Sequence, residues 1–385
     1  MTVKSFDISV SDDILDDLRT RLARTRFTAA SDSTHWAAGV DPGYLRDLVA
    51  YWADGFDWRA AETRLNRYPH YVAEVAGRRV HYVHVRGRRA EGAPAPLPLV
   101  LTHGWPSSFV EMLRVAGPLT DPAGHGGSPA DAFDVIIPSL PGFLYSDLPA
   151  GPFTRRGVAE IWHTLMTEVL GYRRFGAFGG DIGGGVTQWL GALFPGEVVG
   201  VHTTSAVVTS DFQAQPPTAE EKAYLDALDA YDAADGGYSE IMWTRPDTLA
   251  AALADSPAGL VAWIVDKYRD WSDCGGDLES RWDKDTILTV ATLYWATGTI
   301  GSSFRQYYDY YLNAPVSKIT VPAAVTLSHE PAYENFPRTL TERVCTDLRH
   351  WSTPRRGGHF MAHEEPEQVA RELRTFFGPL RSTLS

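Results

Sequence analysis

Short, mostly apolar runs in the first half of the chain predict four strands, at residues 98–102, 133–138, 174–178 and 199–204. Runs of this length, bounded by turn residues, are typical of strands that are buried on both faces of a sheet. Helical spacing of apolar residues predicts one helix over 154–170 and another over 186–194. Strands that alternate with helices predict a mostly parallel sheet with helices on both of its faces.

The N-terminal part of the chain has a different pattern. Apolar residues at helical spacing predict a helix that starts after Ser11, and a second helix is predicted after Asp41. These two helices indicate a segment that packs on a larger body. Residues 71–75 and 80–85 flank a turn at 76–78 and predict a hairpin.

The second half of the chain places a helical region between two groups of strands. Stretches rich in Trp and Tyr run from about residue 211 to 313. They predict a helical lid over the carboxyl ends of the strands, where ligands bind in open α/β sheets. Strands return at 323–327 and 348–352, and a final helix is predicted over 366–377. The predicted organisation is an N-terminal segment, a first core part, a lid and a second core part, over residues 1–95, 96–210, 211–315 and 316–385.

Composition narrows the class of protein. The 385 residues carry a net charge of −13, from 35 basic and 48 acidic residues, which argues against nucleic acid or a membrane surface as the main partner. Only Cys274 and Cys345 are cysteines, no apolar run approaches ~18 residues, and no export signal is present. We therefore expect a cytoplasmic protein. His81 and His84 lack neighbouring Cys or acidic clusters, so we interpret them as sheet residues and expect no metal.

The strand at 174–178 and the helix at 186–194 flank the sequence Gly-Gly-Asp-Ile-Gly at 179–183. A strand, a sharp glycine turn and a helix form the nucleophile elbow of α/β-hydrolases, whose pattern is G-x-S-x-G. Here Asp181 stands at the position of the serine. A phosphate-binding loop is the alternative, but the spacing does not fit G-x-G-x-x-G and no Lys-Ser/Thr pair follows. The pattern predicts an α/β-hydrolase fold with a carboxylate nucleophile.

A carboxylate on an elbow can attack an electrophilic carbon and form an ester. With a reference pKa of ~3.9, an aspartate needs no base for this attack. A base is needed later, to activate the water that hydrolyses the ester. In this fold the acid and the histidine follow the nucleophile in that order. The histidine is predicted to be His359, in the turn Gly-Gly-His-Phe, with His363 as the alternative; the acid is Glu330, with Glu334 as the alternative.

The loop after the strand at 98–102 reads His-Gly-Trp-Pro-Ser-Ser, over residues 103–108. In this fold an oxyanion hole takes one backbone N–H from the residue after the nucleophile and one from this loop. We therefore predict that the N–H groups of Ile182 and Trp105 hold the oxyanion that forms when water attacks the ester.

These motifs together resemble the epoxide hydrolases of the microsomal type, including their soluble bacterial members. The resemblance covers nearly the whole chain, with further similar motifs at 56–59, 65–69, 138–142, 244–248, 255–260 and 293–300. It implies that the N-terminal segment wraps the hydrolase core, and that an epoxide is converted to a vicinal diol without a metal or an organic cofactor. It also suggests a role in bacterial secondary metabolism.

The resemblance further implies two lid tyrosines that donate hydrogen bonds to the epoxide oxygen. By motif match they are Tyr238, in Gly-Gly-Tyr, and Tyr307, although Tyr308 lies beside it. Ring opening places charge on oxygen, and a phenol with a pKa near ~10 can protonate it.

Three features depart from the family. Ile182 replaces a tryptophan that is frequent after the nucleophile, so we expect activity with an altered pocket shape. The loop around Glu330 is one residue shorter than in the animal enzymes. Finally, we expect no counterpart of the membrane anchor of the animal enzymes.

Two other functions fit these residues less well. A haloalkane dehalogenase also uses an elbow aspartate, but it commonly needs a tryptophan donor where Ile182 stands. A non-catalytic hydrolase-like binding protein would be expected to lose the histidine or the acid. The aromatic lid predicts a bulky, apolar or aryl epoxide, with water as the second reactant. A homodimer is one assembly that the sequence leaves open.

Overall fold

A computed structural model describes residues 2–31, 35–89, 92, 95–206, 212, 215–316 and 318–384. The predicted boundary between residues 210 and 211 lies outside the described residues, as do residues 1 and 385 of the predicted first and last segments.

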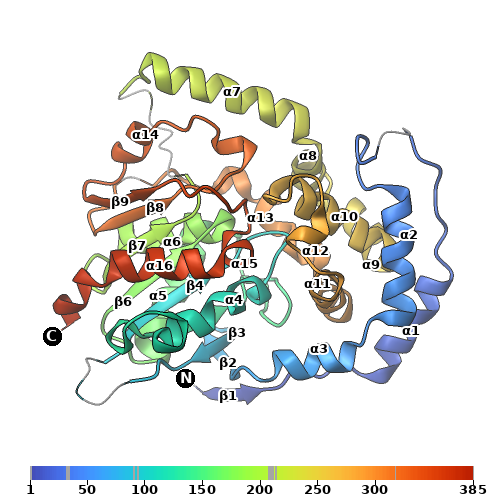
Figure 1. The fold of residues 1–385 in the computed structure, drawn as a ribbon, viewed down its shortest axis with the longest axis horizontal. Helices are drawn as coiled ribbons and strands as arrows, with labels where there is room; N and C mark the ends of the chain where they lie inside the picture. The colour runs from blue at the N-terminus through green and yellow to red at the C-terminus, as the bar shows by residue number, and fades with distance from the viewer. Residues whose placement is uncertain are drawn as a thin grey trace.

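One nine-stranded sheet forms the centre of the molecule, in the order β1-β2-β3-β5-β4-β6-β7-β8-β9 (Figure 1). The strands from β5 to β9 in this order run parallel, while β1, β2, β3 and β5 pair antiparallel. This confirms the predicted mostly parallel sheet. The strands are β1 (Val3–Phe6), β2 (His70–Val75), β3 (Arg78–Val85), β4 (Leu97–Thr102), β5 (Phe133–Pro138), β6 (Phe175–Gly179), β7 (Val198–Thr203), β8 (Ala323–Thr326) and β9 (Leu348–Ser352).

Strand register decides which loops meet at the carboxyl edge of the sheet. Thr102 at the end of β4 pairs with Gly179 of β6, and Gly179 pairs with Thr203 of β7. Further along the same edge, Thr326 at the end of β8 pairs with Ser352 at the end of β9. The loops after these five strands therefore start side by side, which is how residues far apart in sequence reach one site.

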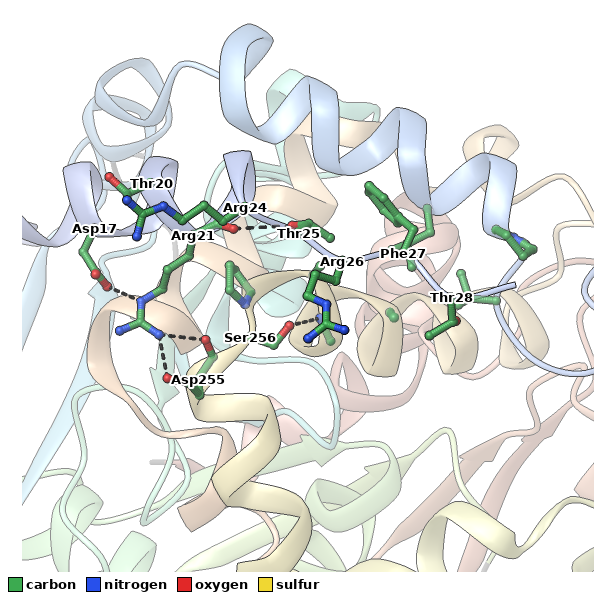
Figure 2. Close-up of a pocket in the computed structure, with 17 residues that line it drawn as sticks. Asp17, Thr20, Arg21, Arg24, Thr25, Arg26, Phe27, Thr28, Asp255 and Ser256 are labelled. Atoms are coloured by element: carbon green, nitrogen blue, oxygen red, sulfur yellow. Dashed lines mark hydrogen bonds and ion pairs between the residues drawn. The ribbon is translucent and has the colours of Figure 1, made fainter. Parts of the chain in front are cut away.

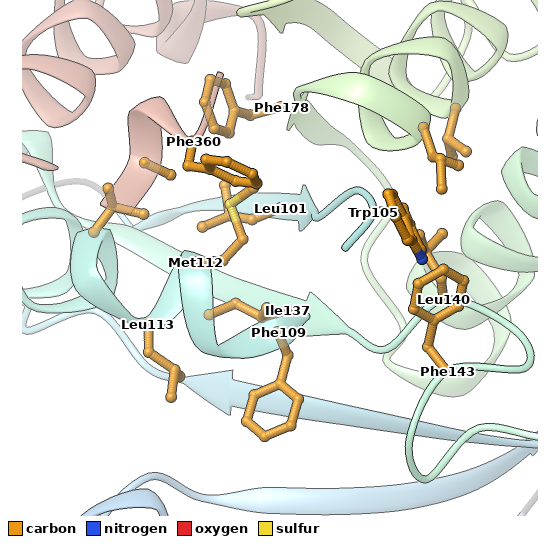
Figure 3. Close-up of a cluster of buried hydrophobic side chains, with 14 of the residues drawn as sticks. Leu101, Trp105, Phe109, Met112, Leu113, Ile137, Leu140, Phe143, Phe178 and Phe360 are labelled. Atoms are coloured by element: carbon orange, nitrogen blue, oxygen red, sulfur yellow. The ribbon is translucent and has the colours of Figure 1, made fainter. Parts of the chain in front are cut away.

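Helices cover both faces of the sheet (Figure 1). One face carries α4 (Phe109–Thr120), α15 (Met361–Glu364) and α16 (Pro366–Phe377), and the other carries α5 (Arg155–Thr164) and α6 (Asp181–Leu193). The helix predicted over 186–194 in fact begins at Asp181. The glycines that follow Asp181 form its first turn, because this turn packs closely against the loop after β4. Figure 3 shows the core between α4 and the sheet, where Met112 lies with Leu101 and Ile137.

The lid lies between β7 and β8, as predicted. It contains α7 (Ala219–Asp235), α8 (Gly237–Thr244), α9 (Pro246–Asp255), α10 (Pro257–Trp271), α11 (Lys284–Thr297), α12 (Ile300–Ser303) and α13 (Arg305–Tyr308). A further helix, α14 (Arg338–Glu342), follows β8. Within the described residues no single helix is long and apolar enough to cross a membrane. Helices α9 and α10, which are bent by 118° relative to each other, reach that length and composition only when they are taken together.

The N-terminal segment contributes to two parts of the molecule. Its strands β1 to β3 extend the sheet, whereas α1 (Asp12–Ala23), α2 (Pro42–Ala50) and α3 (Trp58–Leu65) pack against the lid helices α10 and α11 (Figure 1). The indole N–H of Trp52, for example, donates to the Thr292 hydroxyl of α11 at 3.0 Å. The segment thus links sheet and lid. The predictions missed β1, α3 and α4.

Candidate active site

The elbow after β6 holds Asp181 in a strained backbone conformation, with φ at +52°. Residues other than glycine rarely adopt this left-handed region, and such strain persists where the surroundings fix it. The Asp181 N–H donates to the Ser205 hydroxyl after β7 at 2.5 Å. A Cβ on Gly183 would lie 2.0 Å from the Thr102 carbonyl oxygen, so only glycine lets α6 approach β4 this closely.

The two carboxylate oxygens of Asp181 have different surroundings. Oδ1 accepts a hydrogen bond from the Trp105 backbone N–H at 2.8 Å, and a Cβ on Gly104 would lie 2.4 Å from the same oxygen. Oδ2 lies 3.8 Å from His359 Nε2, beyond a good hydrogen bond. One oxygen is therefore fixed by the loop after β4, while the other faces the histidine.

His359 lies between two carboxylates. Its Nδ1 donates to Glu330 Oε2 at 2.8 Å, and the Ser328 hydroxyl donates to the other oxygen of Glu330 at 2.6 Å. Its Nε2, which faces Asp181, is buried and has no hydrogen-bond partner among the described residues. With Nδ1 donating to Glu330, the neutral ring presents a basic Nε2 toward Asp181.

The two alternative residues lie elsewhere. Glu334 is exposed. His363 stacks on Trp282 at 3.7 Å between ring centroids, and its Nε2 bonds the Arg281 carbonyl oxygen at 3.0 Å. Neither side chain has a contact with Asp181 or with His359 among those described.

Electrostatics favour the protonated form of His359 in the unreacted protein. Burial alone would lower its pKa, but the Glu330 carboxylate, followed by the charges of Asp181 and Glu111, outweighs burial and raises the pKa to about 9. By contrast, burial lowers the pKa of His103 to about 4. That neutral ring accepts from the Leu140 N–H at 3.1 Å and bonds the Gly104 carbonyl oxygen at 3.0 Å, so it holds the loop of Trp105 in shape.

A buried carboxylate that the sequence analysis missed holds the histidine turn. Glu364 accepts backbone hydrogen bonds from Asp273, Gly358 and Phe360, at 2.8, 3.1 and 3.1 Å. The His359 N–H donates to the Trp271 carbonyl oxygen at 2.8 Å. The turn is thus fastened to the end of lid helix α10. The only local signal is an acid one turn after Phe360, and many surface helices share it.

Trp105 joins the core loop to the two lid tyrosines. Its fully buried ring is parallel to Tyr238, with centroids 5.9 Å apart, and perpendicular to Tyr307 at 5.5 Å. Tyr238 and Tyr307 are 6.0 Å apart, whereas Tyr308 is 47% exposed. The predicted pair therefore meets above the loop of Trp105, and Tyr308 points away.

Two further lid residues support Tyr238 and lack a sequence signal. The ring of Trp271 packs against Tyr238 at 5.1 Å and against His359 at 4.9 Å. The buried ammonium of Lys267 lies 5.0 Å from the centre of the Tyr238 ring and pairs with the carboxylate of Asp235 at 3.3 Å. Both lie on α10, whose inward face the sequence pattern marks only as core.

Two cavities are lined by both Asp181 and Tyr238. One of about 120 Å³ touches His359, Glu330 and Trp271. The other, of about 380 Å³, opens beside Tyr307. Its lining combines aromatic rings with charged and polar groups: Arg155, Asp181, Asp232, Gly236, Tyr238, Ser239, Glu240, Trp243, Gln306, Tyr307 and Tyr310.

A larger cavity of about 690 Å³ lies between α1, α2 and the start of α10, and Figure 2 shows its arginine-rich lining. It contains none of the predicted site residues. Its Arg21 is already paired with Asp17 at 2.8 Å and with Asp255 at 2.6 Å. Size alone therefore does not mark the active site.

Comparisons with known proteins agree with this geometry. The family described as "Epoxide hydrolase N terminus" matches residues 3–112, and "alpha/beta hydrolase fold" matches residues 98–239. A protein of Stigmatella aurantiaca (strain DW4/3-1) that carries the provisional name of an epoxide hydrolase is 39% identical over an alignment of 390 residues, which covers 99% of this chain and 86% of the relative. Epoxide hydrolase 1 of Sus scrofa is 32% identical over 409 residues, covering 98% of this chain and 89% of the relative.

Solved structures give the same result. The juvenile hormone epoxide hydrolase of the silkworm Bombyx mori superposes with a TM-score of 0.88 at 28% identity, covering 100% of this chain and 96% of the other. The epoxide hydrolase of Aspergillus niger gives 0.82 at 26% identity, covering 99% and 97%. These matches confirm the α/β-hydrolase fold and the predicted resemblance, and the chain belongs to the epoxide hydrolase family.

Proposed function

We propose that this enzyme hydrolyses epoxides in two steps through a covalent ester on Asp181. One observation carries the proposal. Trp105 N–H holds one oxygen of Asp181, while the other faces the cavity between His359 and the two lid tyrosines. A carboxylate with one oxygen fixed and the other directed at bound substrate is arranged for attack.

In the first step, Asp181 Oδ2 attacks an epoxide carbon and the bond from that carbon to the ring oxygen breaks. The electron pair moves to the ring oxygen, which takes a proton from Tyr307 or Tyr238. Burial raises the pKa of both phenols, so both keep their protons across the neutral range. They donate to the oxygen most strongly as its negative charge develops, which is where a hydrogen bond accelerates the reaction.

In the second step, His359 Nε2 takes a proton from a water molecule that attacks the ester carbon of Asp181. The oxyanion that forms is Oδ1, which already lies at the Trp105 N–H. Ile182 supplies the second N–H in this proposal, since it lies in the first turn of α6, where backbone N–H groups lack helical acceptors. The bond from the ester carbon to Oδ2 then breaks, and the departing oxygen takes the proton held by His359, which gives the vicinal diol. The new carboxyl group of Asp181 returns a proton to the tyrosinate left by the first step, so the site is restored.

The first step also prepares the base for the second. The negative charge of Asp181 is one of the causes that raise the pKa of His359. Ester formation removes that charge, so the pKa of His359 falls and the ring releases its proton more readily. Nε2 becomes basic when the ester is present to be hydrolysed.

The competing reaction is halide release, which wild type distinguishes by its choice of substrate. A pair of tyrosine variants then tests the donor to the epoxide oxygen. Wild type should convert styrene oxide to the diol and release no halide from 1-chlorobutane. Tyr307→Phe should slow the first step about 10²-fold, since one donor to the developing alkoxide is lost. Tyr308→Phe, one residue away on the exposed side, is the matched control and should match wild type. Halide release by wild type without diol formation would replace this proposal with a dehalogenase.

The role of Glu330 is tested by a second matched pair. Glu330→Gln removes the main charge that raises the pKa of His359, so this pKa should fall and ester hydrolysis should slow about 10²-fold or more. Glu334→Gln changes an exposed side chain on the same loop and should leave the rate unchanged. Single-turnover kinetics from pH 6 to 10 measure both. A slow Glu334→Gln beside a normal Glu330→Gln would reassign the acid.

A further inference from the structure

Arg155 brings a positive charge into the cavity of about 380 Å³ beside Asp181. It is the first residue of α5, and its backbone N–H donates to the Asn313 side-chain oxygen at 2.8 Å. It lines the 380 Å³ cavity together with Asp181 and Tyr307. The guanidinium carbon lies 5.1 Å from the centre of the Tyr310 ring, which holds one face of the group.

The Arg155 side chain crosses the surface of helix α6 at Gly185, where the absence of a side chain leaves room for it. A Cβ on Gly185 would lie 2.3 Å from Arg155 Cδ and 2.9 Å from its Nε. Any larger residue there would displace the arginine from its path across α6. Gly185 follows Asp181 by one helical turn, so the same helix that carries the nucleophile also makes room for the arginine.

The charged group of Arg155 has unused hydrogen-bonding capacity. Its buried Nε has no hydrogen-bond partner among the described residues. The next residue, Arg156, pairs with Glu160 at 3.1 Å, but Arg155 forms no ion pair with any carboxylate in the described parts of the chain. The parts of the guanidinium that line the cavity therefore keep N–H donors that can bind an oxygen atom of a substrate.

We propose that Arg155 determines specificity by donating hydrogen bonds to a carbonyl-type oxygen of the substrate, outside the epoxide ring. The same cavity is lined by three acidic residues, Asp181, Asp232 and Glu240, which would repel a negatively charged group of the substrate. A neutral acceptor is therefore favoured over a carboxylate. The substrate class is therefore an epoxide with an ester, ketone or amide oxygen on the arm that enters this cavity. This assignment rests on the proposed chemistry at Asp181.

Two epoxides of equal chain length test the assignment: glycidyl butyrate, which has an ester carbonyl, and 1,2-epoxyoctane, which has none. Arg155→Leu should lower kcat/KM for glycidyl butyrate about 10- to 100-fold, as expected for loss of a hydrogen bond from a charged donor. For 1,2-epoxyoctane the change should stay within about threefold. Arg155→Lys should recover part of the loss, and Arg156→Leu is the matched control for a lost arginine on the same helix.

The design separates this role from two others. An equal loss on both epoxides would overturn the assignment, because it would mean that Arg155 supports Tyr307 or the fold. No loss on either would overturn it as well. If wild type formed diol from neither epoxide nor from styrene oxide, the proposed reaction itself would fail, and this inference with it. Thermal unfolding of each variant shows whether the fold is kept.

Discussion

Alanine in place of Asp181 should lower kcat for epoxide hydrolysis by about 10⁴-fold or more, the largest loss expected from any single change. In the proposed reaction the variant lacks the atom that bonds to substrate, and His359 activates water against an ester rather than against an epoxide carbon. Diol formation from styrene oxide measures the loss. Asp229→Ala, an aspartate on the exposed face of α7, is the control and should be fully active.

Isotope labelling shows whether the lost group bonds to the substrate or only orients it. In a single turnover with excess wild-type enzyme in ¹⁸O-water, the first diol should be unlabelled, since its new oxygen comes from Asp181. The label should instead appear in the protein, within the peptide that contains residue 181. Label in the first diol would mean that water attacks the epoxide directly, and Asp181 would then act as a base.

Local patterns in the sequence single out Asp181, Glu330 and His359, which the structure brings together. The elbow shows as a strand, glycines and a helix around Asp181, and the fold places the acid and the histidine after later strands in fixed order. Register then brings these loops together without further information, as the pairs Thr102–Gly179 and Thr326–Ser352 show. The lid tyrosines needed the family resemblance, because a tyrosine in a helix has no local mark of function.

The sequence could not predict residues whose role depends on contacts between segments that are far apart in the chain. Glu364 matters because it bonds backbone from two different loops, and Ser205 because β7 ends beside the elbow. Arg155 occupies a helix start, where the sequence pattern gives no direction for its side chain. The aromatic lid accordingly predicted an apolar pocket, whereas the cavity also carries Asp232 and Glu240.

The two steps of the proposed reaction differ in their need for a base, and His359→Gln separates them. Glutamine keeps a polar side chain of similar reach but cannot accept the proton of water. The first step needs only Asp181 and the tyrosines, so the variant should form the ester and then stop. Intact-protein mass spectrometry after incubation with styrene oxide should show a gain equal to one substrate molecule, with turnover lowered about 10³-fold or more.

His363→Gln is the matched control for this experiment. Burial lowers the pKa of His363 to about 4, and its ring bonds Arg281 rather than facing Asp181. This variant should turn over substrate and accumulate no ester. The adduct should also disappear in the double variant Asp181→Ala, His359→Gln, since no nucleophile remains. An adduct in His363→Gln and none in His359→Gln would transfer the role of base to His363, because only loss of the base leaves the ester intact.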